Sequence, residues 1–250
     1  MPVPGSPPCA AEVLRRLGPG ATLSHEEAAR RLGIELVDGS DQRRVTVARN
    51  RSRLSLPGWD VKRADLRPDQ ILVLPDGHRV TGPARTVADL AQVLPFDRAV
   101  AAADSALRLQ LVTAAALVAG LLAATGRGAA RLRAVAAMLD PLSGSVFESL
   151  LRVALVSAGL PHPVSQYAIR NEYGRVVARA DLCWVAQRLV VEADGFAFHH
   201  DRLAYRRDRA RMNELERLGW RVLRITWEEL MRSPSAVVEL VVACLDRTAA

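Results

Sequence analysis

The sequence predicts a mixed α/β fold in two domains, covering residues 1–140 and 141–250. In the C-terminal region, three candidate strands lie between two helical segments, and a fourth strand and a closing helix follow. The N-terminal region combines strand-like pieces with a largely helical second half. Between them, "LDPLSGS" at residues 139–145 gathers proline, glycine and serine, which is typical of a domain boundary.

The composition is that of a globular protein with a basic surface. Half of the 250 residues are hydrophobic and 24% are charged, so the chain can bury one large core or two modest ones. The formal net charge is +7, and every basic residue except Lys62 is arginine. This balance favours a polyanionic partner such as DNA, although an arginine bias also arises from genomic composition.

The cysteines and apolar segments indicate a cytoplasmic protein that does not enter a membrane. Cys9, Cys183 and Cys244 are far apart and form no CxxC pair, which argues against a disulfide framework or a zinc knuckle. The first residues lack the basic and apolar regions of a secretory signal. The longest apolar segment, residues 111–124, is short and rich in alanine, which predicts a core helix.

The N-terminal elements follow from capping and turn signals. Ser24 and Glu27 have the spacing of a capping box, which predicts a short helix ending near Gly33. The remaining expected elements are strands at 43–49 and 70–75, a turn at 75–77, and amphipathic helices at 81–94 and 96–112.

The C-terminal elements are more regular. We expect the order helix, three strands, helix, strand, helix, in which glycines at 159 and 219 end the first two helices. The expected bounds are 145–159, 164–170, 175–184, 188–194, 201–219, 220–226 and 233–247.

Four acidic residues converge in this arrangement. Alternation along the third strand puts Glu192 and Asp194 on one face, and a hairpin with the preceding strand brings Asp181 beside them. Glu148 lies on the helix that packs on the sheet. Converging carboxylates repel one another unless a cation such as Mg²⁺ joins them, and such an ion suits phosphodiester hydrolysis.

A second interpretation of the acids stays open. In it, they only end strands and face solvent or arginine partners, for which Arg179 and Arg188 are nearby candidates. A sugar hydrolase that uses an acid pair is a further alternative, but nothing else in the sequence indicates a carbohydrate groove.

An Asp followed after ten residues by Glu-x-Asp, with a Glu on the preceding helix, resembles the PD-(D/E)XK restriction-endonuclease-like core. "FESLLRVALVSAGLP", "ARADLCW", "VVEADG", "RRDRARMNEL" and "GWRVLRIT" are similar to the very-short-patch-repair endonuclease-like domain found in actinobacteria. The resemblance covers roughly residues 145 to 240.

This resemblance implies a Mg²⁺- or Mn²⁺-dependent DNA endonuclease with Asp181 and Glu192 as metal ligands. Glu148 would be an accessory ligand, and Asp194 stands where many relatives have lysine. His199 or His200 would then supply the role of that lysine, with His200 as the candidate catalytic residue.

The helix at 201–219 carries a basic stripe beside the acids. A phosphate backbone suits these arginines, although a solvated face paired with Glu214 and Glu216 is the alternative. The candidate DNA-binding residues are Arg202, Arg206, Arg209 and Arg211.

The N-terminal region resembles another family. "SHEEAARRLG", "LPDGHRVTGPARTVADLA" and "FDRAVAAADSALR" are similar to the middle region of AbiEi-type antitoxins of type IV toxin–antitoxin systems. This implies a cognate toxin as a second candidate partner. It also gives the alternative function: a non-catalytic regulator that keeps the nuclease fold to bind DNA or a toxin.

Overall fold

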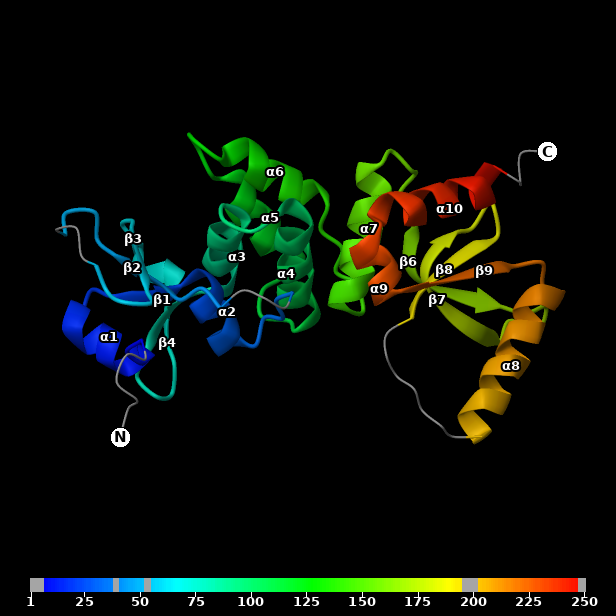
Figure 1. Ribbon diagram of the computed structural model, residues 1–250, viewed down its shortest axis with the longest axis horizontal. Coiled ribbons are helices and arrows are strands. Elements are labelled where there is room, and N and C mark those ends of the chain that lie inside the picture. The colour runs from blue at the N-terminus through cyan, green and yellow to red at the C-terminus, as the bar shows by residue number, and fades with distance from the viewer. Residues whose placement is uncertain (1–6, 38–40, 52–54, 195–201, 247–250) are drawn as a thin grey trace. The chain divides into compact units, whose positions relative to one another are not determined.

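The computed structural model describes residues 7–37, 41–51, 55–194 and 202–246, with side chains from residue 208 onward in the last range. The chain divides into two compact units, Met1–Pro141 and Leu142–Ala250. Each contains a mixed sheet with helices, so the predicted α/β fold class is confirmed (Figure 1). Among the described residues, no helix is both long and apolar enough to cross a membrane.

The N-terminal unit is built on a five-stranded sheet with the order β3-β2-β1-β5-β4. Its first strand pairs antiparallel with β2 and parallel with β5, so the sheet is mixed. The strands are β1 (Thr22–Ser24), β2 (Arg44–Val47), β3 (Asp60–Arg63), β4 (Ile71–Val73) and β5 (Arg79–Thr81).

The helices of this unit occupy mainly its second half, as the sequence predicts. Val13, Leu23, Val45 and Val80 belong to a buried cluster that joins the first helix to the sheet. The helical elements are α1 (Ala10–Leu17), α2 (His25–Leu32), η1 (Pro68–Gln70), α3 (Pro83–Ala91), α4 (Phe96–Arg108), α5 (Ala114–Leu122) and α6 (Ala129–Ala137).

The capping box expected at Ser24 and Glu27 does not form. Ser24 precedes α2, but its hydroxyl oxygen accepts a hydrogen bond from the Thr46 hydroxyl and lies 2.9 Å from His25 Nδ1. Glu27 pairs with arginines of its own helix. His25 has a φ of 54°, so the chain enters the helix through a left-handed residue. The expected helix end at Gly33 is confirmed by a left-handed φ of 77°.

The C-terminal unit has the predicted order of helix, three strands, helix and strand, followed by two helices where one was expected. Its sheet has the order β6-β7-β8-β9, in which β8 and β9 are parallel and the other neighbours antiparallel. The elements are α7 (Val146–Ser157), β6 (Val164–Arg170), β7 (Val176–Trp184), β8 (Leu189–Asp194), α8 (Arg202–Arg217), β9 (Arg221–Thr226), α9 (Trp227–Arg232) and α10 (Pro234–Asp246).

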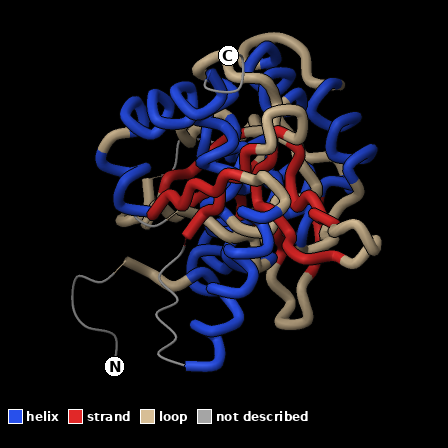
Figure 2. Tube along the Cα trace, turned by 90° about the vertical axis from the view of Figure 1, so that its right-hand side faces the viewer, coloured by secondary structure: helices blue, strands red, loops and turns tan. Residues whose placement is uncertain are grey.

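Helices cover this sheet on two sides. Figure 1 shows α8 separated from α7, α9 and α10 by the strands, and Figure 2 shows the chain from its right-hand side with strands red and helices blue. Leu215 of α8 packs into a buried cluster with Ile169, Cys183 and Val190 of the sheet. Burial of these apolar side chains gives each helix a fixed position against the strands.

The strand register brings the candidate site together at one end of the sheet. The β7–β8 ladder ends at Leu182 opposite Val191, so Asp181 and Glu192 lie just beyond the last paired residues. There the main-chain N–H of Ala193 donates to Asp181 Oδ2 at 3.0 Å. On the other side of β8, Glu192 lies opposite Arg224 of β9. Beyond the last ladder pair, the Asp181 side chain thus reaches the main chain of β8.

Candidate functional site

Two acids from different elements meet at one amide group. Gln166 Nε2 on β6 donates to Glu148 Oε2 at 2.8 Å and to Asp181 Oδ1 at 3.3 Å. Glu148 is 7% exposed, and Asp181 is partly buried. The carboxylate pair that the sequence predicts between the first helix and the second strand is therefore close enough to share one donor.

The first turn of α7 fixes Glu148. Ser145 caps the helix, since its hydroxyl oxygen accepts from the Glu148 N–H at 3.1 Å. The Gly144 N–H donates to Glu148 Oε2 at 2.8 Å. A Cβ on Gly144 would lie 2.9 Å from Glu148 Oε1 and 3.1 Å from Gln166 Nε2, so a side chain at this position would displace one of these two groups.

Burial changes the acidity of Asp181. The pKa of this carboxyl is raised from 3.8 to about 6, first by desolvation and then by the neighbouring Glu148 charge. The Ala193 and Gln166 hydrogen bonds lower the pKa and offset only part of this effect, while Glu192 raises it further. The folded protein therefore favours a proton or a cation at Asp181.

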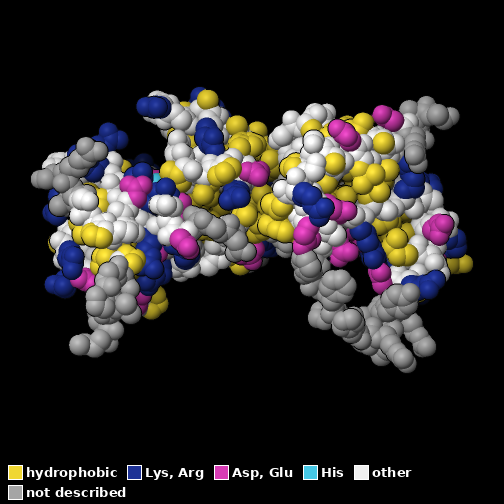
Figure 3. Space-filling view, in the orientation of Figure 1, with side chains coloured by type: hydrophobic (Ala, Val, Ile, Leu, Met, Phe, Trp, Pro, Cys, Tyr) yellow, Lys and Arg dark blue, Asp and Glu magenta, His cyan; other side chains and the backbone are white. Residues whose placement is uncertain are grey.

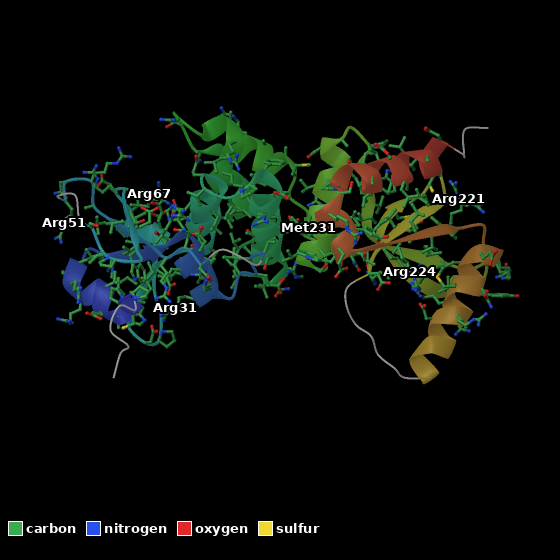
Figure 4. All side chains as sticks on the ribbon, viewed as in Figure 1. Arg31, Arg51, Arg67, Arg221, Arg224 and Met231 are labelled. Carbon is green, nitrogen blue, oxygen red and sulfur yellow. The ribbon has the colours of Figure 1, made fainter. Side chains whose placement is uncertain are left out.

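Glu192 belongs to a separate network of alternating charges. Arg211 of α8 binds it in a bidentate manner, with Nη1 to Oε1 at 2.6 Å and Nη2 to Oε2 at 3.1 Å. Arg224 Nε lies 3.4 Å from Glu192 Oε2. Asp208 accepts from Arg211 at 2.9 Å and from Arg224 at 2.6 Å. Figure 4 labels Arg224 where β9 faces α8.

This network neutralises its own charges. The hydrogen bonds that Arg224 and Arg211 donate lower the pKa of Asp208, and the hydrogen bonds that Arg211 donates to Glu192 and Asp208 raise the pKa of Arg211. Figure 3 shows acidic and basic side chains interspersed on the C-terminal unit. The second interpretation from the sequence, in which the acids have arginine partners, therefore describes Glu192. The two arginines suggested there are not those partners: Arg179 donates to the main-chain oxygen of Gln166, and Arg188 to that of Leu218.

The other residues singled out from the sequence are exposed or lie outside the part of the chain that the structure describes. Asp194 is exposed at the end of β8. His199 and His200 lie outside the described residues, as do the side chains of Arg202 and Arg206. Arg209 is exposed on α8.

Two residues of the site were not identified from the sequence. Gln166 lies in a strand that alternates polar and apolar residues, so the sequence pattern does not distinguish it from an ordinary exposed strand residue. Arg224 lies in the run "WRVLRIT", where its arginine is typical of the exposed side of an edge strand. A signal was available for Arg224, because parallel pairing of β8 and β9 places it opposite Glu192.

Only one part of the described site has carboxylate oxygens that suit a hard cation. Within the described residues, no group of three His, Cys, Asp or Glu side chains is arranged to hold a metal ion. Glu148 and Asp181 provide two crowded, desolvated carboxylates with oxygen donors, which suit Mg²⁺ or Mn²⁺. Both oxygens of Glu192, in contrast, accept from a guanidinium.

Comparison with known proteins found two similar proteins of Mycobacterium tuberculosis, "Uncharacterized protein MT2308" of strain CDC 1551 / Oshkosh and "Uncharacterized protein Rv2248" of strain ATCC 25618 / H37Rv. Each is 30% identical to this chain over 172 residues, which is 68% of this chain and 63% of the relative. The match thus spans less than two thirds of their length. No solved structure matches the chain.

A protein family matches the part of the chain that carries the site. Residues 147–245 match the family REase_MTES_1575, and this range includes Glu148, Gln166, Asp181 and Glu192. The match begins one residue into α7 and ends within α10. The C-terminal domain is therefore restriction-endonuclease-like.

Proposed function

We propose that the C-terminal unit is a metal-dependent DNA endonuclease that hydrolyses phosphodiester bonds. The observation that carries this proposal is the pair of desolvated carboxylates, Glu148 and Asp181, held at one amide beside an arginine pair. The restriction-endonuclease-like family supports a nuclease-type fold with DNA as the class of substrate.

Asp181 and Glu148 would hold the Mg²⁺ or Mn²⁺ ion. When bound, the ion polarises a phosphate oxygen and lowers the pKa of a water molecule. Glu192 is predicted from the family resemblance as a further ligand, and it would have to exchange Arg211 for the ion, since that guanidinium occupies both of its oxygens.

The charged network beside the acids would position the substrate. A guanidinium binds phosphate oxygens with the same bidentate geometry that Arg211 uses on Glu192. We propose that Arg211 and Arg224 contact the phosphate at the site, and that Arg202, Arg206 and Arg209 of α8 contact the neighbouring backbone. Asp194 and His200 are the candidates for orienting the attacking water.

A second candidate function rests on two observations. Asp194 is negatively charged where the resembling nucleases carry lysine, and Glu192 already has cationic partners. Both favour a non-catalytic regulator of the type IV antitoxin kind, which would use the same fold, with the AbiEi-like domain over residues 1–140, to bind DNA or a toxin.

A cleavage assay separates the two functions. Plasmid, single-stranded and mismatch-containing DNA are incubated with Mg²⁺ and with Mn²⁺, using the wild type and a double variant, Asp181→Ala with Glu192→Ala. Glu239→Ala, at an exposed position of α10, is the matched control. We expect metal-dependent cutting that the double variant loses and the control keeps. DNA binding without cutting on any substrate would contradict the endonuclease and support the regulator.

A further inference from the structure

Gln166 has an unusual backbone conformation for a residue in a strand. Its φ is 53°, whereas its neighbours Ser165 and Tyr167 pair regularly with Leu182 and Ala180 of β7. A left-handed conformation costs an L-residue with a Cβ about 1 kcal/mol. The same register places Gln166 opposite Asp181, so the strained residue is the one that reaches the acids.

The amide nitrogen of Gln166 lies between the two acids. Nε2 donates to Glu148 Oε2 and to Asp181 Oδ1. Each carboxylate also accepts from a main-chain N–H: Glu148 Oε2 from Gly144 and Asp181 Oδ2 from Ala193. The two hydrogens of this NH₂ group carry partial positive charge and reduce the repulsion between the two carboxylate oxygens. They do so less than a metal ion would, because the amide has no net charge.

A metal ion on the same oxygens would require the opposite end of the amide. An NH₂ group presents hydrogens and cannot face a cation, whereas the amide oxygen of glutamine is an established ligand type for hard divalent ions. Rotation about the last side-chain torsion exchanges the two ends with little change in shape, because the amide nitrogen and oxygen are nearly isosteric.

We propose that Gln166 is a metal ligand residue, whose amide turns its Oε1 towards the divalent ion that Glu148 and Asp181 bind. This inference rests on the proposed metal-dependent function. It gives the site a third oxygen donor, from a residue type other than His, Cys, Asp or Glu. The ion then has three protein ligands without Glu192 having to give up Arg211.

Two substitutions distinguish a ligand from a positioning donor. Gln166→Leu removes both ends of the amide, whereas Gln166→Glu replaces the NH₂ group with a second oxygen, adds a negative charge and keeps an oxygen donor. Both variants keep a side chain with a Cβ, so the backbone strain at this position is unchanged. Gln187→Leu, in the turn between β7 and β8, is the matched control.

Mn²⁺ binding is measured by titration calorimetry, and thermal unfolding checks that each variant is folded. We expect Gln166→Leu to weaken Mn²⁺ binding by about tenfold or more, in the range found for residues that support metal sites, and Gln166→Glu to keep or strengthen it. In the wild type, the side-chain amide ¹H–¹⁵N signal that Gln166→Leu removes should shift on addition of Mg²⁺.

Three other results would each contradict one of these claims. If both variants lose affinity equally, Gln166 acts only through its NH₂ group and is not a ligand. If Gln166→Leu binds Mn²⁺ as the wild type does, Gln166 has no role in metal binding, although the metal-dependent function stands. If the wild type binds neither ion, the proposed function itself is wrong.

Discussion

Replacing Asp181 with asparagine should stabilise the metal-free protein at neutral and higher pH. The folded state raises the pKa of Asp181 from 3.8 to about 6, so it binds the proton more tightly than the unfolded chain does. The stabilisation from this protonated group is complete below about pH 3.8 and is lost as the pH rises through about 6. Above that pH the wild type must bury a charge that asparagine avoids.

The magnitude follows from the size of the pKa change. At about 1.36 kcal/mol per pKa unit, the difference has an upper limit of about 3 kcal/mol. The Asp181 side chain is partly exposed and solvent screens its charge, so we expect about 1 to 2 kcal/mol. The Ala193 N–H can still donate to the asparagine oxygen.

Urea unfolding with a metal chelator present, followed by tryptophan fluorescence, tests this. Trp184, Trp220 and Trp227 report on the C-terminal unit, and Trp59 on the other. The gain from Asp181→Asn should be present at about pH 8 and nearly absent at about pH 4. An equal change at both values, or a loss of stability at the higher one, would show that Asp181 is not a desolvated acid in the folded protein.

Four further predictions concern other side chains and the backbone at Gly144. Asp208→Asn should lower the unfolding free energy by about 0.5 to 1 kcal/mol at neutral pH. That loss should disappear on acidification, because Arg224 and Arg211 lower the pKa of Asp208 in the folded state; urea unfolding at both pH values checks it. Gly144→Ala should weaken Mn²⁺ binding several-fold in calorimetry, since its Cβ would press on Glu148 and Gln166, whereas Gly20→Ala, with nothing within 4 Å, should not. The His25 ring should stay neutral in an NMR titration down to about pH 4, because burial and then Arg44 lower its pKa to about 3; protonation above that pH would contradict its burial. Cys183, whose pKa burial raises to about 12, should react with a thiol reagent only on unfolding, whereas the exposed Cys9 should react in the folded protein.

Most of the C-terminal fold could be predicted from local signals. The strands over 164–170, 175–184 and 188–194 show the expected composition and are separated by short turns, and Gly159 and Gly219 follow their helices with φ values of 93° and 76°. The N-terminal unit was harder, since strands such as β1 and β3 have only three and four residues. Such short strands are defined by their pairing and leave little periodicity in the sequence.

The candidate site could be predicted only in part. The sequence indicates that Asp181, Glu192 and Glu148 gather, because hairpin pairing and the packing of one helix bring them to the same region. It does not indicate which acid faces which partner. That choice depends on the end of the β7–β8 ladder, on the left-handed Gln166 and on where α8 places Arg211.

The sequence alone determined the order of most elements of the C-terminal unit and the kinds of charged group at the end of its sheet. These follow from local propensity, from periodic burial and from turn residues, all of which act over a few neighbouring positions. Only the tertiary structure decided that Glu148 and Asp181 share the Gln166 amide while Glu192 binds Arg211 and Arg224. The physical reason is that hydrogen bonds and charge pairs act over a few ångströms, so they are fixed by strand register and helix packing between residues far apart in the chain.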